Sequence, residues 1–208
     1  MVGEGVLHEC LLHPDIEKIL ILNRRPANMS HPKLVEVIHS DFFNLSPVEN
    51  QLSGYDACFY CLGSTSLRMK ESEYYSVTYT LTMHVAKVLS SLNPRMTFCY
   101  VSGAGTEAPE KAKFKWARIK GMLEQDLMKL PFRKVYLFRP GLLQRTKGLK
   151  NTHKIYYIFS LFYPVFRLIL PKYVSTLSEL GKAMINTVIK GFDNNILEVP
   201  DIVQLSEC

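Results

Sequence analysis

The sequence lacks the short motifs that point directly to several common reactions. It contains no Gly-x-Ser-x-Gly nucleophile elbow and no Gly-x-x-x-x-Gly-Lys-Ser/Thr phosphate-binding loop. Its histidines show no metal-ligand spacing such as His-Glu-x-x-His, so we predict no metal site. No nucleic-acid-binding motif occurs either, and we expect no nucleic-acid partner. Function therefore has to be inferred from the organisation of the whole chain.

The composition is typical of one folded domain. Hydrophobic residues make up 47% of the 208 residues and charged residues 21%, which argues against disorder. The length is sufficient for one sizeable core and too short for two full domains, so a single domain over residues 1–208 is predicted. The formal net charge of +6 favours anionic ligands or surfaces, although solvated helix faces and loops account for most of the basic residues.

The five cysteines are an odd number, and three of them lie in apolar, strand-like runs. A free thiol in such a run behaves as a small hydrophobic side chain. Cys58 and Cys61 have the Cys-x-x-Cys spacing, but residues three apart on a strand point to opposite faces, so we expect no shared metal or disulfide. Reduced cysteines and the lack of a signal peptide predict a cytoplasmic protein.

One apolar run, residues 155–170 with the sequence IYYIFSLFYPVFRLIL, raises the question of a membrane. It is short for a transmembrane helix, is interrupted by Pro164 and carries a charge at Arg167. A buried or lid-forming helix pair is the favoured interpretation, and contact with a membrane surface is the less favoured one. The run falls within residues 142–173, which we expect to leave the sheet and cap a cleft.

Apolar runs typical of buried strands alternate with stretches of helical periodicity. Strands are predicted at residues 18–23, 34–39, 57–62, 96–101, 134–138 and 196–199. Helices are predicted from the amino terminus to His13 and over residues 47–52, 71–92, 115–130 and 176–191. This alternation predicts an α/β fold with a Rossmann-like, doubly wound parallel sheet and helices on both faces.

The segment from Met96 to Lys120 is the expected centre of a site. A buried strand ends in the small polar turn Ser102–Thr106, and a helix carrying Trp116 and Lys120 follows. Open α/β sheets bind their ligands in the crevice at the carboxyl ends of the strands. We therefore expect the active site, if there is one, at this end of the strand.

Six short motifs lie at the predicted strand ends and helix starts. They are Leu22-Asn23-Arg24-Arg25-Pro26, Ser40-Asp41-Phe42, Tyr60-Cys61-Leu62-Gly63-Ser64-Thr65, Val101-Ser102-Gly103, Trp116-x-x-x-Lys120-Gly121 and Phe138-Arg139-Pro140-Gly141. With these motifs the chain resembles the atypical short-chain dehydrogenase/reductases. It is similar in particular to the small NAD(P)-binding proteins related to nucleoside-diphosphate-sugar epimerases and to the Tat-interacting oxidoreductases. The resemblance covers nearly the whole chain.

The resemblance implies which residues hold a cofactor. Arg24 and Arg25 follow the strand that meets the adenosine ribose in this family. Because no Asp or Glu stands there, NADP is favoured over NAD, with a solvated basic turn as the alternative. Asp41 and Phe42 would lie near the adenine, although Asp41 is also typical of a turn or helix cap. The other implied cofactor-binding residues, on the ribose, nicotinamide and pyrophosphate sides, are Leu62, Gly63, Ser64, Lys120, Pro140, Gly141 and Gly3.

The resemblance also implies that a part is missing. The family begins with a strand and a Gly-x-x-Gly-x-x-Gly loop, which brings the backbone to the pyrophosphate at a helix N-terminus. Met1-Val2-Gly3 looks like the end of that loop, while the strand and the first two glycines are absent. Losing a central strand would expose apolar surface and unpaired edges, so we expect a misplaced start or a trimmed chain. The alternative is that Gly3 and Gly5 are ordinary helix residues.

The catalytic residues are where the chain departs from the family. The family uses a Tyr-x-x-x-Lys pair on one helix face, in which the tyrosine is the general acid and base. Here the pair is Trp116 and Lys120, and an indole N–H does not titrate. The resemblance leaves Ser102, Thr106 and Lys120 as candidate catalytic residues, with the proton coming from Thr106, a nearby tyrosine or water.

Two functions are compatible with these residues. One is an NADP-dependent oxidoreductase or sugar-nucleotide-modifying enzyme acting on a small molecule that the sequence does not identify. The other is a non-catalytic NADP-binding protein that senses the redox state of the cofactor, which the loss of the tyrosine favours. Whether the chain is an enzyme, and whether it forms a homodimer, stays open at this point.

Overall fold

The computed structural model describes residues 1–67, 69–144, 163 and 166–208. The described strands are β1 (Ile19–Asn23), β2 (Leu34–Ile38), β3 (Ala57–Tyr60), β4 (Thr97–Val101), β5 (Lys134–Phe138), β6 (Leu142–Gln144), β7 (Val174–Thr176) and β8 (Ile196–Leu197). The helices are α1 (Val2–Leu12), the 3-10 helix η1 (Ser46–Gln51), α2 (Glu71–Tyr75), the π-helical turn η2 (Ser76–Thr80), α3 (Leu81–Leu92), α4 (Lys115–Leu127), the 3-10 helix η3 (Pro171–Tyr173), α6 (Leu177–Lys190) and α7 (Val199–Ser206).

The described strands pair in parallel. One sheet has the order β3-β4-β5-β8, while β1 pairs with β2 and β6 pairs with β7. Parallel neighbours cannot be joined by a tight turn, so each connection must cross over one face of the sheet. Helices supply the crossovers from β3 to β4, from β4 to β5 and from β5 to β8, whereas a loop joins β1 to β2. The α/β fold class predicted from the alternating pattern is confirmed.

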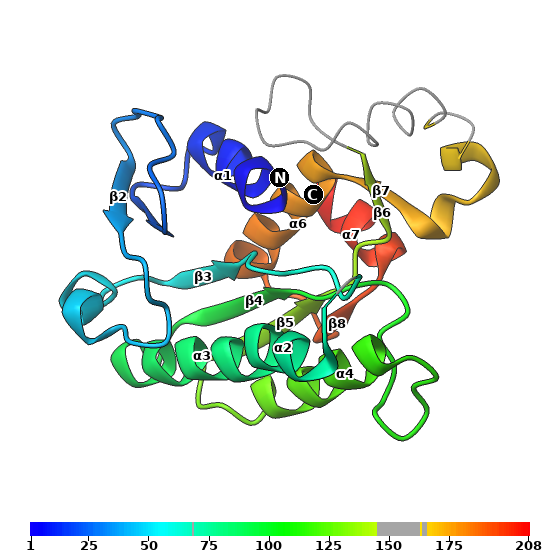
Figure 1. The fold of residues 1–208 in the computed structure, drawn as a ribbon. Coiled ribbons are helices and arrows are strands. Elements are labelled where there is room, and N and C mark those ends of the chain that lie inside the picture. Colours follow the sequence, from blue (N-terminus) through cyan, green and yellow to red (C-terminus); the bar gives the residue numbers. More distant parts are fainter. Residues whose placement is uncertain (68, 145–162, 164–165) are drawn as a thin grey trace.

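Helices cover both faces of the main sheet (Figure 1). On one face α3 and α4 enclose a core that contains Leu89, Phe98 and Leu123. On the other face α1, α6 and α7 enclose a second core that contains Cys99 and Leu180. Phe98 and Cys99 are neighbours in β4 and enter different cores, because successive side chains of a strand point to opposite faces.

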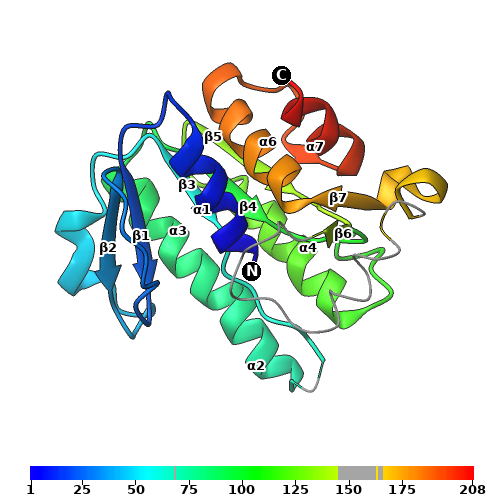
Figure 2. The ribbon, with the colours of Figure 1, turned by 90° about the horizontal axis from the view of Figure 1, so that it is seen from above.

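The sheet is interrupted between β1 and β3 (Figure 2). β1 lies on the side of β2 that is nearer to β3, yet within the described residues β1 pairs only with β2 and β3 only with β4. The ILILN sequence of β1 predicts burial on both faces, but all five residues remain partly exposed. That prediction is wrong because β1 has a partner on one edge only. In β4, which has partners on both edges, four of the five residues are buried.

Local signals explain where the helices begin and end. The Thr176 hydroxyl accepts a hydrogen bond from the Glu179 N–H at 3.0 Å, and the Glu179 carboxylate accepts one from the Thr176 N–H at 2.7 Å. This reciprocal capping box fixes the start of α6, and Gly191, with a φ of 77°, ends it. The helix predicted over residues 176–191 is confirmed for this reason.

Some elements were not predicted from the sequence, and one prediction falls largely outside the described residues. The short strands β6 and β7 have only three residues each, too few for a periodic signal. Helix α7 was not predicted, although its buried residues Val199, Ile202 and Leu205 lie at helical spacing. Of the predicted cap over residues 142–173, residues 145–162 and 164–165 lie outside the described part of the chain. None of the helices in the described part is long and apolar enough to cross a membrane.

Candidate functional site

A cleft of about 580 Å³ opens at the carboxyl ends of β4 and β5. Its size falls within the range of small-molecule sites, roughly 300–1,000 Å³. Strand ends and the loops that follow them line the cleft, together with the first turn of α1, part of β6 and the last residue of η3. The lining residues are Val2, Val101, Ser102, Gly103, Ala104, Pro140, Gly141, Leu142, Leu143 and Tyr173. Three of the predicted site residues, Ser102, Pro140 and Gly141, are therefore brought together at one place.

Two hydroxyl groups lie together at the end of β4. The Ser102 and Thr106 side-chain oxygens are 3.3 Å apart, and the Thr106 hydroxyl donates to the Gly103 carbonyl at 2.8 Å. Both side chains are buried. The small-residue turn predicted to be catalytic is thus folded back on itself, which holds the Ser102 hydroxyl beside the cleft.

Close backbone contacts join the loops after β4 and β5. The Ser102 N–H donates to the Phe138 carbonyl at 2.7 Å, and the Ala104 N–H donates to the Pro140 carbonyl at 3.2 Å. At Gly141 a Cβ atom would lie 2.0 Å from the Tyr173 carbonyl oxygen, so only glycine fits. Pro140 and Gly141 therefore hold the shape of the cleft wall, whatever the cleft binds.

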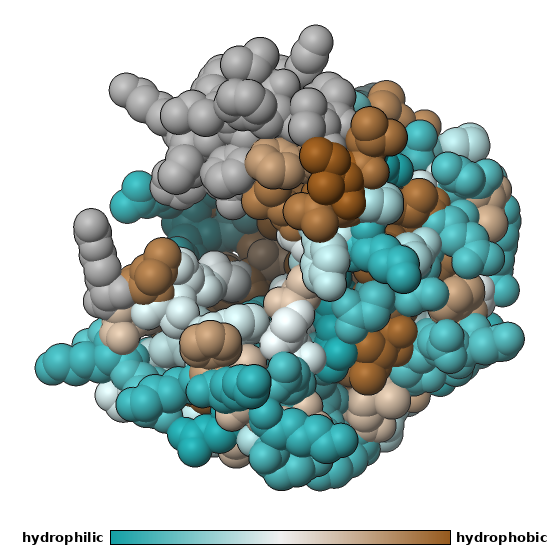
Figure 3. Space-filling view, turned by 90° about the vertical axis from the view of Figure 1, so that its right-hand side faces the viewer, coloured by the Kyte–Doolittle hydropathy of each residue, from teal (hydrophilic) through white to brown (hydrophobic). Residues whose placement is uncertain are grey.

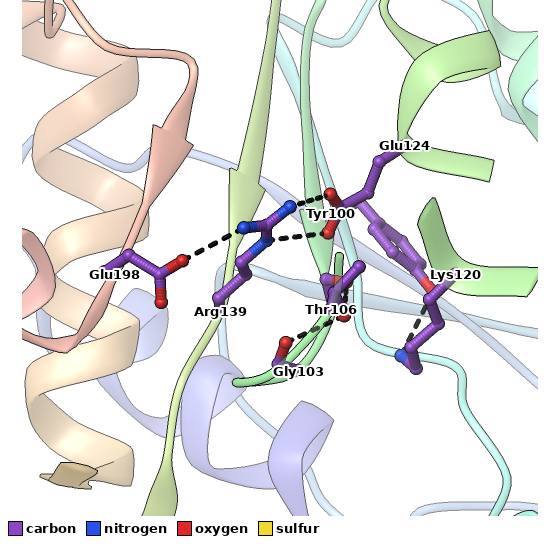
Figure 4. A network of polar contacts seen from close by, with 8 residues as sticks. Tyr100, Gly103, Thr106, Lys120, Glu124, Arg139 and Glu198 are labelled. Carbon is purple, nitrogen blue, oxygen red and sulfur yellow. Dashed lines mark hydrogen bonds and ion pairs between the residues drawn. The ribbon is translucent and has the colours of Figure 1, made fainter. Parts of the chain in front are cut away.

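Lys120 extends from α4 toward the Tyr100 hydroxyl, with an Nζ to OH distance of 3.3 Å (Figure 4). Burial lowers the pKa of Lys120 to about 8, while the carboxylate of Glu124, one turn further along the helix, acts in the opposite direction. Burial also raises the pKa of the Tyr100 phenol well above its usual value. Tyr100 consequently stays protonated and can fix the position of the lysine.

Trp116 stands one helical turn before Lys120 on α4. Its ring stacks on Phe114, with centroids 6.4 Å apart, and its edge reaches the turn after β4, where a Cβ on Gly105 would lie 3.6 Å away. The single tryptophan thus flanks the turn that carries the two hydroxyls. Its contacts are those of a packed aromatic side chain, and its indole brings no titratable group to the site.

A buried ion pair that the sequence analysis missed lies behind the cleft. Arg139 makes two hydrogen bonds to the Glu124 carboxylate and a further one to Glu198 at 3.0 Å (Figure 4). The Arg139 side chain is 15% exposed and that of Glu124 is 5% exposed. This pair joins α4 to the end of β5 and to the residue that precedes α7. Arg139 was noted only as part of a motif, and nothing local in the sequence identifies its partners.

At the β1 side of the same edge the predicted cofactor-binding residues face solvent. Arg24 and Arg25 follow β1 and are exposed. Glu36 on the neighbouring strand accepts hydrogen bonds from the Asn23 side chain at 2.9 Å and from the Ala27 N–H at 2.8 Å. Sequence analysis missed this acidic residue because it comes from the next strand and not from the turn itself. Its hydrogen bonds fix the turn that presents the two arginines.

The remaining predicted residues occupy turns near the ends of β2 and β3. Asp41 accepts the Phe43 N–H at 2.9 Å, which is the turn role weighed as its alternative. Phe42 and Leu62 are partly buried against the core. The residues that follow Leu62, Gly63 and Ser64, are exposed, and a Cβ on Gly63 would meet nothing within 4 Å. No hydrogen bond or ion pair within the described residues joins this group to Ser102 or Lys120.

Gly3 lies in the first turn of α1, close to the end of β3. A Cβ added to it would lie 3.4 Å from the Cys61 Cβ. No side chain caps the amino end of this helix, so its first N–H groups are available to a ligand. The described residues contain no group of three side chains that could hold a metal ion, and the five cysteines are free.

Strand order explains why these groups belong to one edge. From β1 the next strand in the sequence, β2, lies on the outer side, away from β3. The strands β3, β4 and β5 then follow one another on the opposite side of β1. The direction in which strands are added therefore reverses between β1 and β3. Ligands of open α/β sheets bind outside the carboxyl ends of strands at such a reversal. A second cleft of about 510 Å³ lies at the opposite end of β4 and β5 and contains none of the predicted residues. The first cleft is therefore the candidate site.

Comparison with solved structures identifies the fold as that of the short-chain dehydrogenase/reductases and related epimerases. A short-chain dehydrogenase/reductase from Saccharomyces cerevisiae superposes with a TM-score of 0.67 at 11% identity, covering 98% of this chain and 94% of that chain. A UDP-galactose 4-epimerase gives a TM-score of 0.64 at 11% identity, covering 98% and 78%. The Bordetella bronchiseptica enzyme WbmG in complex with NAD gives 0.63 at 11% identity, covering 99% and 74%.

Comparison with curated proteins finds similar sequences in fungi. Protein fmp52-1, mitochondrial, of Aspergillus oryzae is 24% identical over 69% of this chain, and the chain spans 62% of that protein. Protein FMP52-1, mitochondrial, of Scheffersomyces stipitis is 28% identical over 73% of this chain and 68% of its own length. Protein FMP52, mitochondrial, of Eremothecium gossypii is 29% identical over 74% and 65%. No family model matches the sequence.

These relatives correct one expectation. Free cysteines were taken to indicate the cytoplasm, but the related proteins are named as mitochondrial. The prediction of a cytoplasmic location is therefore wrong. Its physical basis was too weak, because a free thiol reports a reducing environment and not a particular compartment.

Proposed function

We propose that this protein binds a nicotinamide dinucleotide along the carboxyl edge of the sheet and acts on a small molecule in the cleft as an oxidoreductase or a sugar-nucleotide-modifying enzyme. The observation that carries the proposal is the placement of Lys120 together with the Ser102–Thr106 hydroxyl pair. These groups come from the helix and the strand end that meet at the site. The solved structures that share the fold include a reductase and an epimerase, which supports this class of chemistry.

The residues present fit the nicotinamide side of such a cofactor. Lys120 would hydrogen-bond the ribose hydroxyls, with Tyr100 keeping its ammonium group in place. Pro140 and Gly141 would flank the nicotinamide ring, and Ser102 would donate to the substrate oxygen. A bound nicotinamide dinucleotide supplies a hydride, so the chain itself has to provide orientation and a route for one proton.

Proton transfer cannot come from the residue at the usual tyrosine position, because Trp116 does not titrate. The pKa of Lys120, about 8, lies close to neutral pH. A lysine with that pKa can release and regain a proton during turnover. General acid–base catalysis is most efficient when the pKa of the catalytic group lies near the working pH. We infer that Lys120 exchanges the proton with the substrate oxygen through the Ser102 and Thr106 hydroxyls or through water.

The β1 side supports NADP over NAD. Arg24 and Arg25 are exposed, and their guanidinium groups suit a 2′-phosphate. Glu36, the acidic residue nearest in the fold to this turn, is engaged by Asn23 and Ala27. An acid already bonded in this way is poorly available for the free ribose hydroxyl of NAD.

We further infer that one more parallel strand belongs between β1 and β3. Within the described residues both strands lack a partner on the edge that faces the interruption, and β1 is only half-buried despite its apolar sequence. Unpaired edges of this kind are normally covered. A strand there would also carry the backbone to the amino end of α1, where a pyrophosphate would bind.

A second function, a non-catalytic sensor of NADP redox state, is favoured by one observation. Trp116 occupies the position of the general acid and packs as a structural side chain. Binding would then be retained and hydride transfer lost. For either function we propose a mitochondrial location, which the names of the related fungal proteins support.

The test uses the single tryptophan as a reporter. Trp116 lies beside the turn that lines the cleft, so its fluorescence should be quenched when a nicotinamide ring binds. NADPH and NADH are titrated against the 208-residue chain and against a version extended by an apolar strand and a Gly-x-x-Gly-x-x sequence before Met1. We expect the extended version to bind NADPH more tightly than the shorter chain.

Variants separate the parts of the proposal. Replacing both arginines, Arg24→Ala and Arg25→Ala, should weaken NADPH binding by about tenfold or more and leave NADH binding unchanged. The double variant Arg95→Ala with Arg133→Ala, which removes two exposed arginines at the opposite end of the sheet, is the charge-matched control. Absence of binding by either nucleotide to either version would contradict the proposal. Binding without hydride transfer across a panel of carbonyl and sugar-nucleotide substrates would favour the sensor, and activity created by Trp116→Tyr would identify the missing acid.

A further inference from the structure

The chain exposes four large apolar side chains within six residues. Leu168 is 83% exposed, Ile169 66%, Leu170 43% and Tyr173 62%. Figure 3 shows apolar side chains gathered on the face of the molecule that carries them. Isolated exposed apolar side chains are normal, whereas a contiguous group marks a surface that contacts something other than water. We call these four residues the apolar ridge.

The ridge is held firmly against the domain. Arg167, which directly precedes it, donates to both oxygens of the Glu179 carboxylate on α6, at 3.0 and 2.7 Å. The same guanidinium donates to the Tyr163 hydroxyl at 3.1 Å and to the Val174 carbonyl at 3.3 Å. The ridge ends at Tyr173, whose carbonyl packs against Gly141. Its apolar side chains are therefore presented outward by fixed backbone and not by a loose end.

The formal net charge of the chain comes from the stretch of sequence that contains the ridge. Residues 142–173 contain six basic residues and no acidic one: Arg145, Lys147, Lys150, Lys154, Arg167 and Lys172. The chain has 25 basic residues, so the remainder holds 19, which equals the 19 acidic residues of the chain. The whole formal net charge of +6 thus belongs to this stretch of sequence. Of its described members, Lys172 is exposed between Leu170 and Tyr173.

We propose that the apolar ridge docks on the surface of an anionic lipid bilayer. Leucine, isoleucine and tyrosine side chains enter the boundary between headgroups and acyl chains, while nearby basic side chains meet anionic headgroups. The combination of an apolar group with positive charge and no acidic residue selects this partner over a second copy of the chain. A two-fold dimer through the same surface would bring Lys172 of one copy toward Lys172 of the other.

The proposal is tested by flotation of the 208-residue protein with vesicles of phosphatidylcholine, with and without phosphatidylserine. Binding to the anionic vesicles should be about tenfold or more tighter than to the neutral ones, and added salt should weaken it. The double variant Leu168→Ser with Ile169→Ser should lose most of the binding. Lys172→Gln should weaken it by about fivefold, the amount expected for one surface charge.

A matched control is Leu12→Ser, which removes a leucine of similar exposure, 68%, at the far end of α1. It should bind vesicles as the unchanged protein does, and urea unfolding should show that all variants are folded. The proposal is overturned if the protein binds neither kind of vesicle, if binding is equal with and without phosphatidylserine, or if the ridge variant binds normally. Gel filtration that shows a dimer abolished by the ridge variant would overturn it in favour of an interface between copies.

Discussion

The two sides of the carboxyl edge of the sheet differ in how many buried contacts hold their side chains in place. On the β4 and β5 side, buried hydroxyls, a buried ion pair and close loop contacts surround the cleft. On the β1 and β3 side, the strands lack a common partner, and Arg24 and Arg25 stand in solvent. Both sides were predicted as parts of one site, but only the first has the buried contacts that hold side chains in fixed positions.

This difference suggests that the two sides would contribute differently to ligand binding. Groups held in place before a ligand arrives lose little freedom on binding, whereas exposed arginines must be ordered by the ligand itself. The lysine and hydroxyls of the β4 side are therefore suited to positioning a reacting group. The arginines of the β1 side are suited to selecting a charged ligand, and their contribution will depend on salt.

The largest expected effect on the free energy of unfolding comes from breaking the Arg139–Glu124 ion pair on the β4 and β5 side. Glu124→Gln leaves the largely buried Arg139 guanidinium with an uncharged neighbour and with the half-exposed Glu198 carboxylate. We therefore expect a cost toward the lower end of the roughly 3–5 kcal/mol typical of breaking a buried pair. Urea unfolding should show this loss. Glu71→Gln is the control, because Glu71 pairs with Lys115 and Arg118 at the surface, where water screens such pairs and they contribute little to stability. If the two substitutions lowered the unfolding free energy equally, the Arg139–Glu124 pair would contribute no more than a surface ion pair.

A matched pair of leucines tests the comparison directly. Leu137 in β5 is 1% exposed, while Leu22 in β1 is only partly buried against the same core. Leu137→Ala should cost about 2–5 kcal/mol of unfolding free energy, and Leu22→Ala about 1 kcal/mol. An additional strand beside β1 would bury Leu22 further and raise the cost of Leu22→Ala toward that of Leu137→Ala. The extended version described above should therefore bring the two values together, and a difference that persists would argue against that strand.

Much of the fold could be predicted because burial leaves local patterns. The runs that form β4 and β5 are apolar except for their first residues, Thr97 and Lys134, and the predicted limits agree with the observed ones within a residue. Thr176 and Glu179 are a capping pair that can be read from their spacing, and Gly191 marks the helix end. The strand-end motif likewise predicted that Ser102 lies at a cleft, and Ser102 lines the candidate site.

The rest depends on contacts between residues that are distant in the sequence. Arg139, Glu124 and Glu198 form one network across separations of 15 and 59 residues, which no periodic pattern records. Glu36 supports the turn after β1 from the neighbouring strand. The half-burial of β1 reflects its pairing on one edge only within the described residues, which its own apolar sequence does not record. Such features follow from the order of the strands, which is a global property.

The smallest expected effect concerns the protonation of Lys120. Burial lowers its pKa from 10.5 to about 8, so below about pH 8 the lysine is protonated in both the folded and the unfolded chain and its burial costs stability. Between about pH 8 and 10.5 the folded protein has released a proton that the unfolded chain retains. Because the unfolded state then binds more protons, the stability contributed by this residue rises with pH.

Lys120→Met should therefore be more stable than the unchanged protein at pH 7, by roughly 1–3 kcal/mol, and the advantage should shrink as the pH approaches 10. Urea unfolding at several pH values measures this difference, in which the other titrating groups largely cancel. Lys113→Met, an exposed lysine in the loop before α4, should show no such trend. A Lys120 curve parallel to the Lys113 curve would mean that Lys120 titrates as a surface lysine. It would then be too strongly protonated at neutral pH to exchange a proton with a substrate, and the β4 side would retain only its binding role.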